Sequence, residues 1–123
     1  MIYLDTNVLI RFFTKDDLAK AKKVKELLQR ESKILINDVV LPELDYVLRK
    51  TYNLQRSDVA AAYRFLLSCP SISFSKVIHE AAHLYETSNL SMADCIIAAA
   101  SFDGKLASFD NNLLKTPGVK PYW

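Results

Sequence analysis

The sequence is poor in the residues that mark several classes of protein. It has two glycines, four prolines and two cysteines among 123 residues, and half of its residues are apolar. This composition excludes disordered and fibrous chains. No apolar run approaches the roughly 20 residues of a membrane span, and Asp5 lies too near the start for a secretory signal. We therefore expect a cytoplasmic protein without a membrane segment.

The cysteines and the chain length bear on how the fold is stabilised. Cys69 and Cys95 match no metal-binding spacing, and Cys95 lies in an almost wholly apolar stretch, so we expect buried, reduced thiols. A chain of this length removes roughly two thirds of its unfolded surface from water without disulfides. Because no repeat or linker interrupts the sequence, it predicts a single domain over residues 1–123.

The net charge of +2 is unevenly distributed. Basic residues crowd the N-terminal quarter: Arg11, Lys15, Lys20, Lys22, Lys23, Lys25 and Arg30. Two interpretations stay open. The side chains form either the solvated face of a helix or an electrostatic surface for a polyanion.

Short apolar segments alternate with helical periodicity along the whole chain. We expect strands at residues 2–4, 33–36, 71–74 and 106–109, and helices at residues 8–13, 16–31, 42–52, 57–68, 75–88 and 91–102. No hairpin signal joins the strands. This alternation predicts the α/β class, as a three-layer α/β/α fold with a central parallel sheet of about four to five strands.

Acidic residues stand at places where one predicted element gives way to the next. Asp5 and Asp110 follow strands, whereas Glu43 and Asp94 open helices. Sites in parallel sheets form beyond the carboxyl ends of the strands, so the four carboxylates are expected to converge. Such a cluster repels itself unless a cation fills it, and oxygen ligands favour Mg²⁺ or Mn²⁺. The pattern therefore indicates a metal-dependent enzyme.

Each acid also has a purely structural interpretation. Asp5 could cap a helix, Glu43 could favour the helix dipole, and Asp110 could begin a turn. Asp94 completes the S-x-x-D pattern of a capping box. Helical spacing places Glu43 at the border of the buried face of its helix and points Asp45 away from that face.

Four segments together carry a family resemblance: MIYLDTNVLI, the Glu43 segment LPELDYVL, the SMADCIIAAA helix and ASFDNNL. With them the whole chain resembles the PIN domain family, and closely its small VapC-type toxins. The resemblance implies a Mg²⁺- or Mn²⁺-dependent endoribonuclease, the toxin of a type II toxin–antitoxin pair, which leaves a 3′-hydroxyl and a 5′-phosphate on its RNA substrate. It also implies a cognate antitoxin and a homodimer. The implied catalytic and metal-binding residues are Asp5, Glu43, Asp94 and Asp110, with polar support from Thr6, Asn7 and Ser108.

The chain departs from the family pattern at two positions. Asn89 stands where the family often has glycine, and Asn112 stands where some members carry a further acid. The number of bound metals therefore stays open.

A competing motif is H-E-x-x-H, the zinc protease signature, in the segment HEAAH. It contains both histidines, His79 and His83, so a third zinc ligand would have to be an acid such as Glu86 or Asp103. On the predicted helix, however, the two histidines lie nearly opposite the apolar face. We expect them to be exposed and to have no catalytic role.

Two further alternatives remain. The segment Asp5-Thr6-Asn7-Val8 approximates the D-x-D-x-[TV] opening of a phosphatase, but Asn7 replaces the second acid. A non-catalytic adaptor or receiver-like module could also bind Mg²⁺ at an acidic sheet edge. No lysine follows the predicted fourth strand in the position that a phospho-receiver needs.

Overall fold

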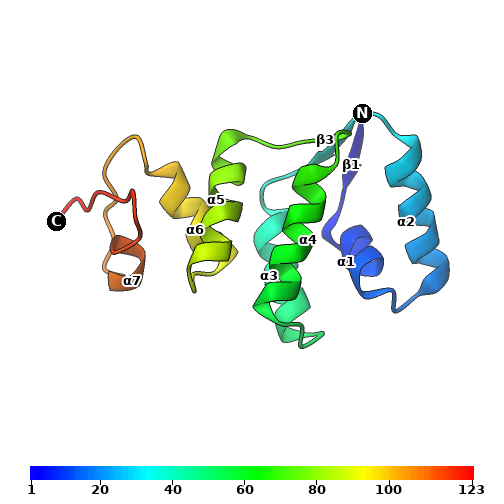
Figure 1. Cartoon of the computed structure of the whole chain (residues 1–123), viewed down its shortest axis with the longest axis horizontal. Helices are drawn as coiled ribbons and strands as arrows, with labels where there is room; N and C mark the ends of the chain where they lie inside the picture. The colour runs from blue at the N-terminus through cyan, green and yellow to red at the C-terminus, as the bar shows by residue number, and fades with distance from the viewer. The chain divides into compact units, whose positions relative to one another are not determined.

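The computed structural model describes residues 1–123, which fall into two compact units, Met1–Phe74 and Ser75–Trp123. Figure 1 gives the course of the chain through both units. None of the helices combines the length and the apolar character needed to cross a membrane.

The first unit contains the whole β-sheet. Strands β1 (Ile2–Leu4), β2 (Ile34–Ile36) and β3 (Ile72–Ser73) are parallel and lie in the order β1-β2-β3. Leu4 pairs with Ile36, so β1 and β2 end at the same level. The predicted α/β class with a parallel sheet is confirmed, but the sheet has three strands, fewer than the sequence suggested.

Helices connect and flank these strands (Figure 1). They are α1 (Thr6–Thr14), α2 (Leu18–Arg30), α3 (Val40–Lys50) and α4 (Arg56–Ser68). The side chain of Asp17 caps α2 by accepting a hydrogen bond from the Lys20 N–H at 3.1 Å. At α4 the capping residue is Gln55, which shares a capping box with Asp58, so α4 begins one residue before the predicted start at residue 57.

Helix α3 differs from the sequence-based expectation at Asp45, which is 4% exposed, whereas Glu43 is exposed. Leu41 is also fully buried. Compared with the face predicted from the sequence, the buried face of α3 is therefore rotated about the helix axis toward Leu41 and Asp45. The prediction that Asp45 points away from the core was therefore wrong. Its charge is balanced in part by Arg49, one helical turn later, at 3.8 Å.

The second unit consists of helices α5 (Lys76–Thr87), α6 (Met92–Ala100) and α7 (Asn111–Leu114). The apolar faces of α5 and α6 are buried, and His79 and His83 lie outside the buried face of α5. Both histidines are exposed, as expected. Cys95 is fully buried on α6, and Cys69 in the first unit is half-buried; neither forms a disulfide.

The predicted fourth strand, residues 106–109, is not part of the sheet. Leu106 instead forms an isolated parallel bridge with Pro121. The Ser108 hydroxyl then accepts a hydrogen bond from the Asp110 N–H at 3.0 Å, which turns the backbone into α7. An apolar run becomes a strand only where a neighbour continues the ladder, and here the ladder stops after one bridge.

The loop between α1 and α2 is attached to the end of α3 through Asp16. The Tyr52 hydroxyl donates a hydrogen bond to the Asp16 carboxylate at 2.9 Å, and Thr14 and Arg11 bind the same carboxylate. The bond from Tyr52 is the largest cause that lowers the pKa of Asp16; desolvation opposes it, and Thr14 and Arg11 lower the pKa further. The same bond raises the pKa of Tyr52.

The substitution Tyr52→Phe should raise the pKa of Asp16 back toward its usual 3.8. A carboxyl whose pKa is lowered by folding stabilises the protein above its unfolded-state pKa, and this stabilisation is lost as the pH falls through the folded-state pKa. The variant should therefore lose less stability than the parent between pH about 4 and the folded-state pKa. A carboxyl NMR titration measures the shift, and Tyr46→Phe, at an exposed tyrosine of α3, is the control. An unchanged Asp16 titration would contradict the assignment.

Candidate active site

Asp5 follows β1 directly and forms the N-cap of α1. Its Oδ1 accepts a hydrogen bond from the Thr6 N–H at 2.8 Å. The other carboxylate oxygen has no hydrogen-bond partner in the protein, and Asp5 is exposed to solvent. Capping thus occupies one oxygen of Asp5 and leaves the second for a ligand.

Glu43 lies in the first turn of α3, and its Oε2 accepts a hydrogen bond from the Thr6 hydroxyl at 2.9 Å. Thr6 is only 6% exposed, so its position is fixed by packing. Thr6 therefore holds two carboxylates at once, that of Asp5 through its backbone and that of Glu43 through its side chain. Asn7, next along α1, is exposed and makes no side-chain hydrogen bond.

Asp94 lies in the first turn of α6, where only half of the predicted capping box is formed. The Ser91 hydroxyl accepts a hydrogen bond from the Asp94 N–H at 3.2 Å. The Ser91 N–H does not donate the second bond of a capping box to the Asp94 carboxylate. The half-buried carboxylate of Asp94 is therefore not used for capping.

Asp110 caps the short helix α7. Its Oδ1 accepts hydrogen bonds from the Asn112 N–H at 3.0 Å and the Leu113 N–H at 3.2 Å. Its own N–H donates a hydrogen bond to the Ser108 hydroxyl. The turn-forming interpretation of Asp110 is thus correct for one oxygen, and the other oxygen has no partner in the protein.

The candidate acids divide between the units. Asp5 and Glu43 are brought together by Thr6 in the first unit, and Asp94 and Asp110 belong to the second. No group of three or more His, Cys, Asp or Glu side chains within either unit is placed to hold a metal ion.

The sequence model of the PIN domain family matches residues 2–119. The chain belongs to the PIN domain family. PIN domains are generally nucleases, which hydrolyse the phosphodiester bonds of nucleic acids and typically use divalent metals. No curated protein and no solved structure matches the chain.

The structure also places two polar residues of this PIN domain that the sequence analysis missed. Asn37 and Asp38 follow β2, and because Leu4 pairs with Ile36 they lie at the same sheet edge as Asp5. The Asn37 side chain accepts a hydrogen bond from the Val39 N–H at 3.1 Å, and the Asp38 side chain is exposed. The strand-end rule that selected Asp5 would have selected both.

At α6 the cap is supplied by Ser91 and not by the carboxylate of Asp94, so substitutions of the two residues should differ in their effect on stability. Ser91→Ala should lower the free energy of unfolding by about 1 kcal/mol, because the cap is lost. Asp94→Asn should cost about 0.5 kcal/mol or less, chiefly through the weaker interaction with the helix dipole. Urea denaturation of the two variants measures both effects. A larger loss for Asp94→Asn would mean that its carboxylate is needed for the cap.

Proposed function

We propose that this PIN domain is a Mg²⁺- or Mn²⁺-dependent endoribonuclease and that residues 1–123 form a single nuclease domain. The observation that carries the proposal is the junction at Thr6, which fixes Asp5 and Glu43 from two separate elements. Each of the two carboxylates keeps an oxygen without a partner. A cation site needs carboxylates from separate elements with oxygens left without partners, whereas acids that only stabilise the fold do not.

The donor set fits a hard cation. Asp5, Glu43, Asp94 and Asp110 would hold the metal, and all of their donor atoms are carboxylate oxygens, which suit Mg²⁺ and Mn²⁺. When bound, such an ion neutralises phosphate charge and lowers the pKa of an attacking water.

The remaining polar residues position these acids. Thr6 restricts Glu43 to one orientation through a hydrogen bond to a charged acceptor, which is stronger than a neutral one. Ser108 fixes the backbone of Asp110 and thereby the direction of its carboxylate. Asn7 is free to contact the substrate, because its side chain makes no bond within the protein.

The central test is Asp5→Asn in an assay of end-labelled single-stranded RNA with Mg²⁺, Mn²⁺ or EDTA. The amide keeps the oxygen that accepts from Thr6 but removes the charge that a cation requires. We expect the parent to cut RNA only with metal, leaving 5′-phosphate ends, and the variant to lose at least about 100-fold in rate while staying folded. Full activity of the metal-loaded variant would remove Asp5 from the site.

The control is the double variant His79→Ala and His83→Ala. Both side chains are exposed, so each change should cost about 0.5 kcal/mol or less and leave RNA cleavage unaltered. Stoichiometric zinc that disappears with the histidines, together with activity, would overturn the nuclease proposal in favour of zinc chemistry. Metal that raises the melting temperature without any RNA cleavage would instead indicate an adaptor.

Thr6 offers a sharper test of positioning. Thr6→Val keeps the shape of the side chain but removes the hydrogen bond to Glu43, and should slow cleavage by about 10- to 100-fold, as loss of an orienting partner does. Thr6→Ser retains the hydroxyl and should restore most of the rate. Equal losses in both variants would assign Thr6 a packing role only.

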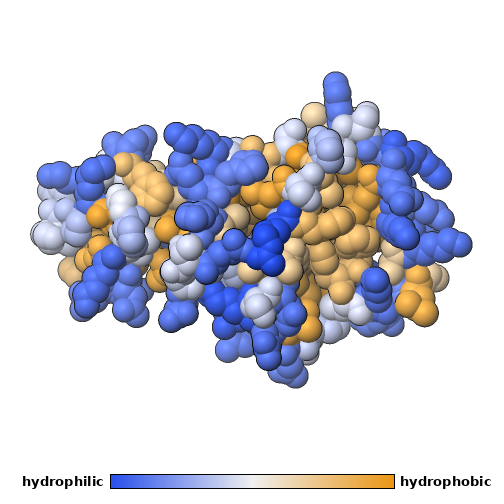
Figure 2. Space-filling model, viewed as in Figure 1, coloured by the Kyte–Doolittle hydropathy of each residue, from blue (hydrophilic) through white to orange (hydrophobic).

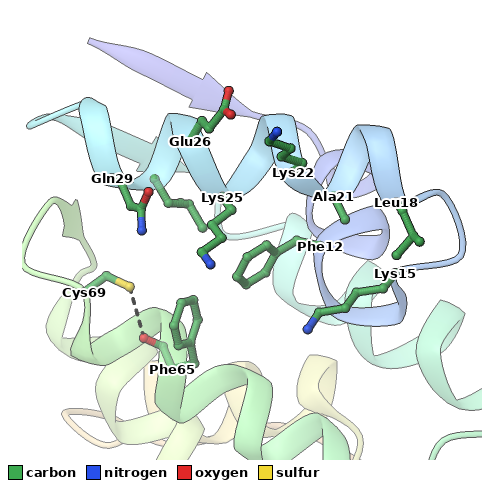
Figure 3. A pocket seen from close by; sticks show the side chains of 11 residues that line it. Phe12, Lys15, Leu18, Ala21, Lys22, Lys25, Glu26, Gln29, Phe65 and Cys69 are labelled. Carbon is green, nitrogen blue, oxygen red and sulfur yellow. Dashed lines mark hydrogen bonds between the residues drawn. The ribbon is translucent and has the colours of Figure 1, made fainter.

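We further propose that the protein is the toxin of a type II pair and forms a homodimer, as the resemblance to VapC-type toxins implies. A surface suited to an antitoxin is an apolar groove of about 810 Å³ between α2 and α4. Figure 2 shows its apolar surface, edged by the hydrophilic side chains of α2. In Figure 3, Phe12 and Phe65 line the groove and Lys15 and Lys25 reach toward its opening. The ring centroids of Phe12 and Phe65 are 5.4 Å apart.

The charge around the groove selects the kind of partner segment. Lys15, Lys22 and Lys25 line the groove and none of them forms an ion pair, whereas Glu26 is the only acid in the lining. An amphipathic antitoxin helix with acidic flanks complements both the apolar floor and the basic rim. In a co-expressed complex, Phe65→Ala and Lys25→Glu should each weaken antitoxin binding about tenfold or more. Tyr46→Ala, outside the groove, should leave it unchanged, and equal binding in all variants would exclude the groove.

A further inference from the structure

Two aromatic side chains of the second unit are stacked and almost fully exposed. The rings of Phe109 and Trp123 lie 4.9 Å apart at an angle of 11°. Phe109 is 88% exposed and Trp123 is 70% exposed. Tyr122, 64% exposed, meets Trp123 edge to face at 5.5 Å. Apolar side chains of this size are normally buried, so a stacked pair in solvent indicates a binding surface.

The backbone around the pair places the two rings together. The Leu106 N–H donates to the Lys120 carbonyl at 2.8 Å, and the Tyr122 N–H donates to the Leu106 carbonyl at 2.9 Å. These bonds set segments 106–109 and 120–123 side by side, and the rings of Phe109 and Trp123 meet beyond the bridge between Leu106 and Pro121.

A glycine turn precedes the second segment. Gly118 has φ of +93°, and a Cβ there would lie 2.9 Å from the ring of Phe102. Lys120 then donates through Nζ to the Phe102 carbonyl at 2.8 Å. The Gly118 turn and the Lys120 bond therefore fix the start of the segment that carries Trp123.

The surroundings of the pair are suited to a polyanion. Phe109 stands between Ser108 and Asp110, the residues assigned to the nuclease site. Lys105 precedes the first segment and Lys120 opens the second, and neither lysine forms an ion pair, although the Lys120 Nζ donates to the Phe102 carbonyl. Flat aromatic faces with ammonium groups close to them in the sequence suit a chain of nucleobases joined by phosphates.

We propose that Phe109 and Trp123 form a stacking platform for unpaired bases of the RNA substrate, next to Asp110. The inference rests on the proposed function and names its substrate class as single-stranded RNA. Bases in a duplex are already stacked on one another, so only unpaired bases can lie on the exposed face of the pair. Every base has an aromatic face, and the platform therefore adds affinity without strict sequence preference.

Trp123 is the only tryptophan of the chain, so its fluorescence reports on the platform directly. The experiment titrates the full chain in EDTA, where no cleavage is expected, with a ten-nucleotide oligouridylate and with a matched RNA duplex. We expect saturable quenching by the single strand only. Phe109→Ala should weaken binding by about 5- to 150-fold, the loss typical of one base–aromatic stack, and Phe109→Tyr should restore it. Tyr46→Ala, at an exposed aromatic residue of α3, should bind like the parent.

The outcomes separate this inference from the nuclease proposal. Quenching by single-stranded RNA in a protein that never cuts RNA would support the platform and overturn the nuclease. Metal-dependent cleavage with no quenching, and with an unchanged KM in Phe109→Ala, would overturn the platform alone. Equal quenching by the duplex would also overturn it. A fluorescence change that depends on protein concentration without RNA would show that a second copy of the chain covers the pair, and would likewise overturn it.

Discussion

The hydrogen-bonding of Thr6 is the constraint on which the candidate site depends. Two carboxylates that share a neighbourhood repel each other, and this repulsion lowers stability unless donors or a cation compensate it. Thr6 supplies a backbone donor to Asp5 and a hydroxyl donor to Glu43. Because Thr6 is buried at the start of α1, the compensation is built into the junction between β1 and α1 and does not rely on mobile surface groups.

Structural and chemical roles share the same carboxylates without conflict. Asp5 and Asp110 each use one oxygen to cap a helix and keep the other without a partner. A carboxylate has two oxygens and several acceptor positions, so one cap does not exhaust it. At each position the choice between helix cap and metal ligand is therefore not exclusive. Asp94 differs from Asp5 and Asp110 because its carboxylate takes no part in capping. Ser91 alone supplies the cap of α6 and leaves the carboxylate of Asp94 for other uses.

The sequence predicted those features of the fold that depend on local rules. Short-range rules located Asp5 after β1, the Ser91 cap of α6 and the exposed histidines of α5. They failed where a distant segment decides the outcome. Leu106 was expected to join the sheet but pairs with Pro121, a partner that no local pattern announces.

Asp45 marks a second limit of prediction from sequence. An apolar pattern gives the axis of a buried face only to within about one residue, and the neighbours of α3 rotate that face toward Asp45. Of the candidate site, Asp5 and Glu43 could be paired only once the hydroxyl of Thr6 was seen between the two elements, because its bond to Glu43 spans 37 residues of sequence.

The structure also sorts the basic residues, for which the sequence left two interpretations open. The lysines of α2 are exposed, and two of them, Lys22 and Lys25, line an apolar groove, which is a poor surface for RNA because phosphates gain nothing from apolar contact. Lys105 and Lys120 are fewer, yet they lie close in sequence to the stacked rings of Phe109 and Trp123. Association with RNA requires stacking faces and cations at the same place, whereas association with an amphipathic helix requires an apolar floor. The proposed groove and the proposed platform therefore divide the basic residues between two surfaces, with those of α2 proposed for a protein partner and Lys105 and Lys120 proposed for RNA.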